Sequence, residues 1–468
     1  MAGMHAYHGY ALDLPGDGRR RLAVGWLWLG LAALVGSGLF AVLLVVSRAP
    51  YVKDLIPTAD FFRVALIVHV DLSVLVWFVA LGGMLWSLNS TTRALRFGWA
   101  ALWVTAAGTV LMAAAPFAGG GVPVMSNYIP VVDGRGFVAG LVVFGAGTAM
   151  LVLRSMLAVP RVGTRLDGAG ALRFGLNAAL VSAALALLAF AWSWAKVPAT
   201  LDGKAYYEVL FWGGGHVLQF TWTLLMLVAW LWLAEAAGAK LPVSPRVATL
   251  FLGVGLVSVF ATPVVYLAWD VVSMQHYRYL TWIMRFGGGL AILPFALALA
   301  WGLATLKRPA AGAQPLIAAL VTSMVLFGAG GAIGFLIEGS NVKIPAHYHG
   351  CIVGVTLALM GLVYHLLPKL GYAPPPPRLA AWQAWLYGAG QLAHVVGLAW
   401  SGGYGVQRKV AGAEQVLRSG AEIAGMGLMG LGGLVAIIGG LLFVVVVLKA
   451  LRPGSRDFDA DPVERAAR

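Results

Sequence analysis

The stretch Ile344-Pro345-Ala346-His347-Tyr348-His349-Gly350 decides the fold, because it places two histidines at the start of a long apolar run. Residues two apart on an α-helix project about 200° apart around its axis. We therefore predict that His347 and His349 point to opposite sides of one membrane helix, so that this helix can serve two separate metal centres. Ionisable side chains inside a bilayer are rare and mark functional sites.

The composition identifies a membrane protein. Of the 468 residues, 60% are hydrophobic and 11% are charged, whereas a soluble domain carries about 25% charged residues. The net charge of +14 does not indicate nucleic-acid binding, because the basic residues lie in short loops between apolar segments, where they set membrane topology. The single cysteine, Cys351, excludes an internal disulfide, a four-cysteine iron–sulfur cluster and a c-type haem attachment in this chain.

Apolar segments of about 20 residues predict an all-α bundle of about twelve transmembrane helices in one membrane domain, residues 1–468. Residues 1–21 and 451–468 form polar tails. Most of the 32 Lys and Arg residues fall on the side of the termini, which predicts cytoplasmic termini in the inner (cell) membrane of a bacterium or archaeon. The predicted spans are 22–47, 62–88, 97–117, 136–157, 172–196, 206–236, 247–271, 279–305, 315–338, 345–368, 381–402 and 424–450. The 61 glycines indicate close helix packing in lipid.

Five histidines share one depth in this topology. They lie in the outer part of the membrane although they are scattered along the sequence: His69, His216, His276, His347 and His349. A single histidine inside a membrane is often a hydrogen-bonded packing residue, but five at one depth favour metal or haem binding, since imidazole is the usual ligand of haem iron and copper. His365 lies too deep to join the set, and we expect a hydrogen-bonded structural role for His394.

These residues resemble the catalytic subunit, subunit I, of the haem–copper oxidase superfamily, which includes oxygen reductases and nitric-oxide reductases. The resemblance covers essentially the whole chain. It implies a low-spin haem and a high-spin haem, for which we expect the b type, and one non-haem metal, copper or iron. By resemblance, His69 and His349 are the axial ligands of the low-spin haem, and His347 is the proximal ligand of the high-spin haem.

The resemblance also implies a distal metal site and a propionate site. His216, in Trp212-Gly213-Gly214-Gly215-His216, matches the ligand of the non-haem metal on the sixth span. Gln275-His276-Tyr277 stands where the family has a His-His pair at the end of the seventh span, so that Gln275 replaces one histidine. Arg408 and Lys409 match the basic pair that meets the haem propionates.

Two departures from the family's pattern predict the substrate. Oxygen reductases use a tyrosine beside the distal metal, and its two usual positions hold Phe220 and the Trp269-Asp270 pair, while Tyr266 and Tyr277 are out of register. Nitric-oxide reduction to nitrous oxide needs only two electrons and no tyrosine. We therefore expect nitric-oxide reduction, with Gln219 near the site in place of the usual glutamate; oxygen reduction to water by a cytochrome c or quinol oxidase is the alternative.

Polar residues on the seventh span suggest a proton path. Ser258, Thr262, Tyr266 and Asp270 recur every four residues and lead toward His276; the alternative is a polar seam between helices. Glu208 and Glu338, at outer ends of spans, are alternative proton entry points or solvated acids. Asp71 lies two residues after His69 and faces away from it, so we expect it to hydrogen-bond a neighbouring helix.

Two other function classes compete with an enzyme. A haem-binding sensor or assembly protein would keep the haem ligands without turnover, whereas a transporter would leave the histidines unexplained and would show the internal repeats that this chain lacks. The expected partners are membrane lipid, nitric oxide or oxygen, and an electron donor, either a cytochrome c-like or cupredoxin-like subunit or a quinol. No nucleic-acid partner is expected.

Overall fold

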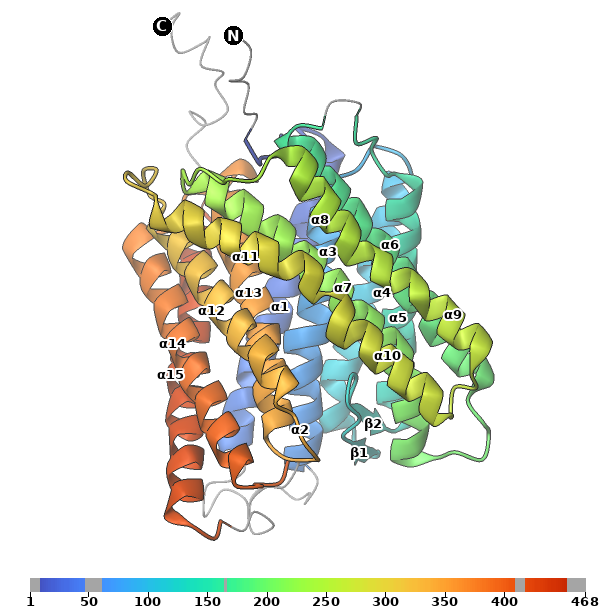
Figure 1. Ribbon diagram of the computed structural model, residues 1–468. Helices are drawn as coiled ribbons and strands as arrows, with labels where there is room; N and C mark the ends of the chain where they lie inside the picture. Colours follow the sequence, from blue (N-terminus) through green and yellow to red (C-terminus); the bar gives the residue numbers. More distant parts are fainter. Residues whose placement is uncertain (1–8, 47–60, 164–165, 409–416, 453–468) are drawn as a thin grey trace, which may run out of the picture. The chain divides into compact units, whose positions relative to one another are not determined.

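The computed structural model describes residues 9–46, 61–163, 166–408 and 417–452, and these are almost entirely helical (Figure 1). The elements are α1 (Gly18–Val46), α2 (Phe61–Val70), the π-helix η2 (Asp71–Val76), α3 (Trp77–Leu88), α4 (Leu95–Ala118), β1 (Val122–Val124), β2 (Val131–Asp133), α5 (Arg135–Leu157), α6 (Gly168–Lys196), α7 (Gly203–Ala236), α8 (Pro245–Val257), the 3₁₀ turn η3 (Ser258–Phe260), α9 (Ala261–Ala268), α10 (Met274–Gly287), α11 (Gly289–Ala304), α12 (Gln314–Phe335), α13 (Lys343–Lys369), α14 (Pro377–Gly403) and α15 (Gly420–Ala450).

The predicted membrane bundle is confirmed. Eleven helical segments of the described chain are long and apolar enough to cross a membrane. The one predicted span that is missing from these eleven, 381–402, corresponds to α14, which has 27 residues but is less apolar because it carries Gln383, Gln391 and His394. Gln383 is fully buried and accepts a hydrogen bond from the Tyr364 hydroxyl at 2.9 Å, which satisfies this polar group inside the bundle.

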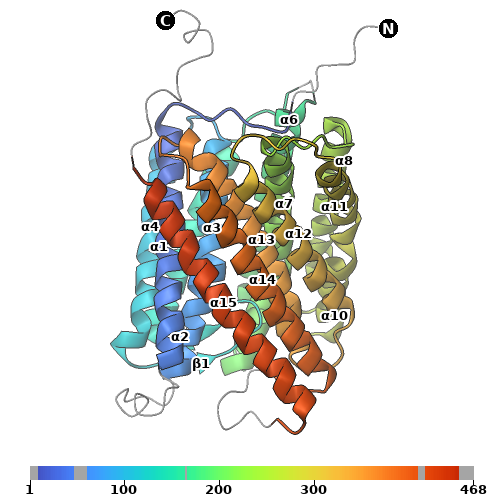
Figure 2. The same ribbon diagram turned by 90° about the vertical axis from the view of Figure 1, so that its left-hand side faces the viewer.

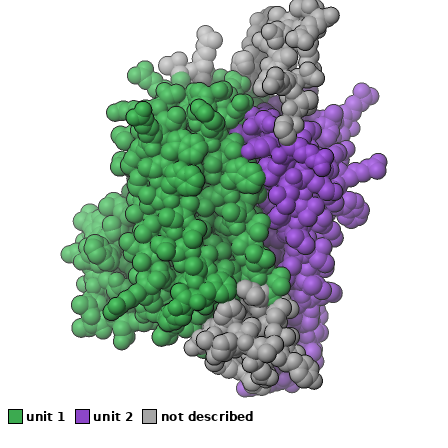
Figure 3. Space-filling view, turned by 180° about the vertical axis from the view of Figure 1, so that it is seen from behind, with its two compact units in different colours: residues 1–228, 242–298 green, residues 229–241, 299–468 purple. Residues whose placement is uncertain are grey.

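The chain divides into two compact units (Figure 3). The first comprises residues 1–228 and 242–298, and the second comprises residues 229–241 and 299–468. The first unit contains α1 to α6, most of α7, and α8 to α10. The second contains α12 to α15.

Glycines bring helices together within each unit. In the first unit, a Cβ on Gly108 of α4 would lie 2.3 Å from the backbone nitrogen of Phe144 on α5. In the second unit, α14 and α15 run side by side (Figure 2), and a Cβ on Gly397 would lie 2.4 Å from the nitrogen of Met429. Only glycine permits such backbone contact, which provides the van der Waals packing that holds helices together in lipid.

The seventh span ends earlier than the sequence predicted. We expected it to continue to residue 271, with His276 at its outer end, but α9 ends at Ala268 and Trp269 is extended. The hydroxyl of Ser273 accepts a hydrogen bond from the backbone nitrogen of His276 at 3.2 Å, which caps the start of α10. His276 therefore belongs to the first turn of the following span.

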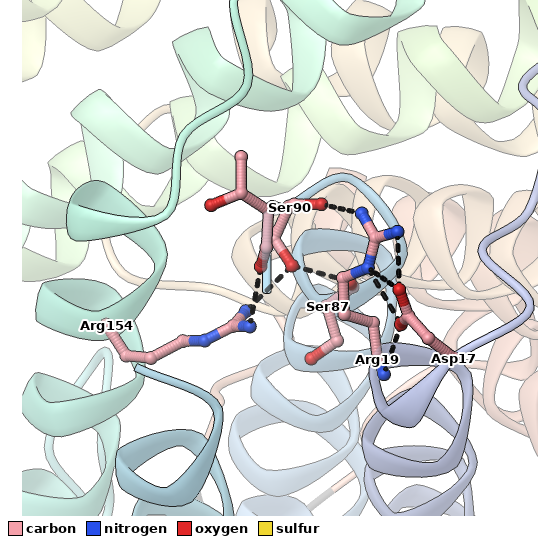
Figure 4. A network of polar contacts seen from close by, with 6 residues as sticks. Asp17, Arg19, Ser87, Ser90 and Arg154 are labelled. Carbon is pink, nitrogen blue, oxygen red and sulfur yellow. Dashed lines mark hydrogen bonds and ion pairs between the residues drawn. The ribbon is translucent and has the colours of Figure 1, made fainter. Parts of the chain in front are cut away.

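A buried arginine fixes the end of α3. Arg154 of α5 is fully buried and donates to the hydroxyl of Ser90 at 3.0 Å and to the carbonyl oxygen of Thr91 at 3.4 Å. Arg19, paired with Asp17 at 2.8 Å, donates to the carbonyl oxygen of Ser90 (Figure 4). The two guanidinium groups satisfy groups just beyond the C-terminus of α3, where the helix dipole favours positive charge.

Gly330 and Gly331 on α12 provide a matched test of this packing. A Cβ on Gly330 would lie 2.6 Å from the backbone nitrogen of Cys351 on α13, whereas a Cβ on Gly331 meets nothing within 4 Å. We predict that Gly330→Ala lowers stability by about 2 kcal/mol through overpacking, and that Gly331→Ala is neutral or stabilising because alanine favours helix. Thermal loss of helical circular dichroism in detergent measures both; equal midpoints would contradict the prediction.

Candidate functional site

His69 lies at the end of α2 in the first unit and is oriented by α1. Its Nδ1 lies 2.8 Å from the carbonyl oxygen of Ser37 and 2.9 Å from the Ser37 hydroxyl. A carbonyl oxygen can only accept, so Nδ1 carries the proton. The lone pair is then on Nε2, which is the arrangement of a histidine prepared to bind a metal.

The π-helix η2 follows His69 directly. Its first residue, Asp71, is buried and has an oxygen, Oδ2, for which the described residues offer no hydrogen-bond partner. The bond to a neighbouring helix that we expected is therefore not found for this oxygen. Single π-helical turns are frequent at functional sites.

His347 and His349 face different helices of the second unit, as the spacing predicted. The Nδ1 of His347 donates to the carbonyl oxygen of Gly330 on α12 at 2.7 Å. The ring of His349 lies 4.9 Å from the ring of His394 on α14, between centroids. The Nδ1 of His394 in turn donates to the carbonyl oxygen of Met429 at 2.9 Å, which gives His394 the hydrogen bond expected of it.

Glycines on α12 make room for His347. A Cβ on Gly334 would lie 2.7 Å from the Nδ1 of His347, so only glycine allows the ring to lie against this helix. The carbonyl oxygen of Gly330, one turn earlier, is the acceptor for the same nitrogen. The Nε2 of His347 is therefore the ring nitrogen that keeps its lone pair.

His216 on α7 contacts a tyrosine that the sequence did not predict near it. Its Nδ1 donates to the carbonyl oxygen of Trp212 at 2.8 Å, and its Nε2 lies 3.1 Å from the hydroxyl of Tyr128. Tyr128 belongs to the turn between the antiparallel strands β1 and β2. No sequence signal linked this turn, 88 residues before His216, to the histidine.

Other contacts fix the turn that carries Tyr128. The hydroxyl of Tyr207 on α7 donates to Asp133 at 2.9 Å, and the side-chain amide of Asn127 donates to Glu208 at 2.8 Å. The Ser126 hydroxyl donates to the carbonyl oxygen of Ile129. Burial and the Glu208 carboxylate raise the pKa of Tyr128 above its ordinary value, so the side chain is a neutral phenol in the metal-free protein.

The three glycines before His216 each receive an aromatic ring. A Cβ would lie 2.0 Å from the Tyr266 hydroxyl at Gly213, 2.4 Å from the Phe190 ring at Gly214, and 2.2 Å from the Tyr128 ring at Gly215. The run of glycines in the sequence therefore reflects crowding by aromatic side chains around the turn of α7 that carries the histidine.

His276 is buried on α10 and packs against Tyr266. The two rings are perpendicular, with centroids 4.6 Å apart. The Tyr266 hydroxyl is 2.7 Å from the hydroxyl of Ser193 and donates to the carbonyl oxygen of Ala189 at 3.1 Å. The Nδ1 of His276 is buried and has no hydrogen-bond partner within the described chain.

Trp212 connects the surroundings of the two histidines in the first unit. Its ring lies 4.6 Å from the ring of His216 and 4.6 Å from the ring of Tyr277, which follows His276 on α10. The indole nitrogen of Trp212 is also buried without a partner among the described residues. These rings form one aromatic cluster. We call it the distal cluster, and it consists of His216, His276, Trp212, Tyr128, Tyr266 and Tyr277.

The two glutamines proposed for this site differ in their placement. Gln219 is partly buried, and its Oε1 lies in the interior without a partner among the described residues. Gln275 is exposed, whereas its neighbour His276 is buried, because consecutive residues of α10 project about 100° apart. The structure therefore does not bring Gln275 into the distal cluster.

The residues expected to form a proton path have different surroundings in the structure. Ser258 donates to the carbonyl oxygen of Gly287 at 3.2 Å, and Thr262 is buried with its hydroxyl lacking a partner in the described chain. Tyr266 lies one helical turn after Thr262 on α9. Asp270 lies beyond the end of α9, is exposed, and accepts a hydrogen bond from the nitrogen of Val272 at 3.2 Å.

The remaining predicted residues lie at loop ends. Glu338 is exposed. Arg408 donates to the hydroxyl of Ser340 at 3.2 Å, and Lys409 lies outside the described residues. His365, which we excluded from the site, packs with its ring 6.0 Å from Trp232 in the second unit.

The described residues fit haem and metal binding in part. Three candidate ligands, His69, His216 and His347, donate from Nδ1 to a carbonyl oxygen, which leaves the lone pair on Nε2. At His216 this Nε2 is hydrogen-bonded to the Tyr128 hydroxyl. However, the described residues bring together no group of three His, Cys, Asp or Glu side chains. Among the described residues, His216 and His276 are therefore not joined by a third side chain of these types.

Comparison with known proteins agrees with this arrangement. The family described as Cytochrome C and Quinol oxidase polypeptide I matches residues 21–449. An uncharacterized protein of Rickettsia prowazekii is 27% identical over 92% of this chain and 96% of its own length. An uncharacterized protein of Aquifex aeolicus is 27% identical over 74% of this chain and 85% of its own length.

The fold is also similar to that of a solved structure. A heme-copper terminal oxidase, determined as a dimer by cryo-electron microscopy, matches with a TM-score of 0.73 at 16% identity, over 94% of this chain and 86% of its own. The match to the family covers nearly the full length of the chain, and the helical fold agrees with it. This chain is a member of the haem–copper oxidase subunit I family, a family of membrane-bound terminal oxidases and reductases that carry haems and a copper or iron centre.

Proposed function

We propose that this chain is the catalytic subunit of a membrane reductase that converts nitric oxide to nitrous oxide. The observation that carries the proposal is the face of α7 just beyond His216. Phe220, four residues after His216, is buried in an apolar cluster with Val217 and Val259, so this position offers no phenol. Gln219, on the same side as His216, offers a buried amide oxygen instead.

In this proposal the haems and the distal metal supply the electrons. His69 and His349 hold the low-spin haem, His347 holds the high-spin haem, and His216 and His276 hold the distal metal. Two molecules of nitric oxide, two electrons and two protons give nitrous oxide and water, so two metals suffice for the electron count. The electrons come from a partner subunit or a quinol, because the chain has no haem c motif and a single cysteine.

Oxygen reduction is the second candidate, and a specific observation favours it. Tyr266 packs perpendicular to His276, and the Tyr128 hydroxyl lies on the Nε2 of His216. Both tyrosines lie outside the positions that oxygen reductases normally use. Either could still supply the electron and proton needed to cleave the O–O bond, since a phenol can give up both.

The haem assignment is tested by three single substitutions. We predict that His69→Ala and His349→Ala each remove the low-spin haem spectrum, because each removes an axial ligand. His347→Ala should spare that spectrum and remove the haem that binds carbon monoxide. Visible absorption and haem content of the purified complex measure the result. An intact low-spin spectrum in His69→Ala would contradict the pairing, and His365→Ala serves as the control.

The substrate assignment is tested by turnover under matched electron supply. We predict that nitric oxide is consumed about tenfold faster than oxygen, which corresponds to about 1.4 kcal/mol in activation free energy. Anaerobic measurement of nitrous oxide and separate oxygen uptake provide the comparison. Rapid four-electron reduction of oxygen without peroxide release would support the second candidate. A complex with haem but no turnover of either gas would indicate a sensor.

A further inference from the structure

We propose that Tyr128 is a ligand of the distal metal, so that His216, His276 and the Tyr128 oxygen form the metal site. The inference rests on the proposed function, because it assumes that His216 binds a metal. It differs from the family pattern in that the third ligand comes from the β1–β2 turn rather than from a helix.

The separation of the two donor atoms supports shared coordination. The Tyr128 hydroxyl lies 3.1 Å from the Nε2 of His216. Two donors on one metal with bonds of about 2.0 Å stand about 2.8 Å apart at a right angle and about 3.3 Å apart at the tetrahedral angle. The separation of the two atoms is therefore compatible with their binding one metal after the hydroxyl loses its proton.

A glycine beside His216 leaves room for the ring of this tyrosine. A Cβ on Gly215 would lie 2.2 Å from the Tyr128 ring, so the residue before His216 must be glycine for the ring to approach. Bonds from Tyr207 to Asp133 and from Asn127 to Glu208 hold both sides of the turn against α7. A ring held in this way is preorganised, as a metal ligand needs to be.

Two buried polar atoms on the helices that carry His216 and His276 have no hydrogen-bond partner among the described residues. The Nδ1 of His276 and the Oε1 of Gln219 are buried without partners in the described part of the chain. No three His, Cys, Asp or Glu side chains meet among the same residues. The Tyr128 oxygen already lies within hydrogen-bond distance of the Nε2 of His216, a candidate ligand. On coordination its phenolic proton passes to water or to a nearby base.

Metal content and spectroscopy of the purified complex test the proposal. Tyr128→Phe keeps the ring and removes the oxygen, and Gly215→Ala displaces the ring. Both should weaken retention of the non-haem metal at least tenfold, because loss of even an outer-shell partner costs about 10–100-fold. Gly145→Ala on α5 is the control, since its Cβ would meet nothing within 4 Å. Haem content should be unchanged in Tyr128→Phe.

Resonance Raman spectra of the oxidised complex give a second measurement. Tyrosine bound to the metal should show enhanced phenolate modes that shift with ring-deuterated tyrosine and vanish in Tyr128→Phe. If the non-haem metal content and the Raman spectrum were both unchanged in Tyr128→Phe, while the metal was lost in His216→Ala, the role of Tyr128 alone would be overturned. Absence of non-haem metal from the wild-type complex would overturn both the inference and the proposed function.

Discussion

The hydrogen bond from an imidazole Nδ1 to a backbone carbonyl oxygen is the interaction on which this structure depends. It recurs at four histidines: His69, His216, His347 and His394. Inside a bilayer no water can satisfy a ring N–H, so the protein must supply the acceptor. Because a carbonyl oxygen only accepts, each bond fixes the tautomer and leaves the lone pair on Nε2. The same contact thus satisfies the buried N–H and leaves Nε2 in the form that can bind a metal.

Glycine makes these contacts possible. His347 can reach the carbonyl oxygen of Gly330 because Gly334 leaves space beside its ring. In the first unit the glycines before His216 admit three aromatic rings around α7. An alanine at these positions would force the ring or the helix to move, and cores tolerate such overpacking poorly. The glycine content of the chain therefore serves ligand placement as well as helix packing.

The sequence predicted the features that depend on local periodicity. The apolar spans and the different neighbours of His347 and His349 follow from helix geometry and membrane thickness. Features that depend on loops were not predictable. Tyr128 reaches His216 through a turn 88 residues away in the sequence, and the Ser273 cap moves His276 to the next helix. The exposure of Gln275 follows from that same cap, because it fixes which side of α10 each residue occupies.

A tyrosine ligand would change the chemistry of the distal metal. Imidazole and amide donors are neutral, whereas a phenolate carries negative charge and stabilises the more oxidised state of a metal. Imidazole ligands alone suit copper or iron, and oxygen donors make a site more suitable for harder ions. A site of His216, His276 and Tyr128 would have this harder character. Such a site would be more difficult to reduce than one with three imidazoles. Its reduction would favour return of a proton to Tyr128, which lies beside the Asn127–Glu208 pair. Electron and proton delivery would then be coupled at the turn that carries the tyrosine.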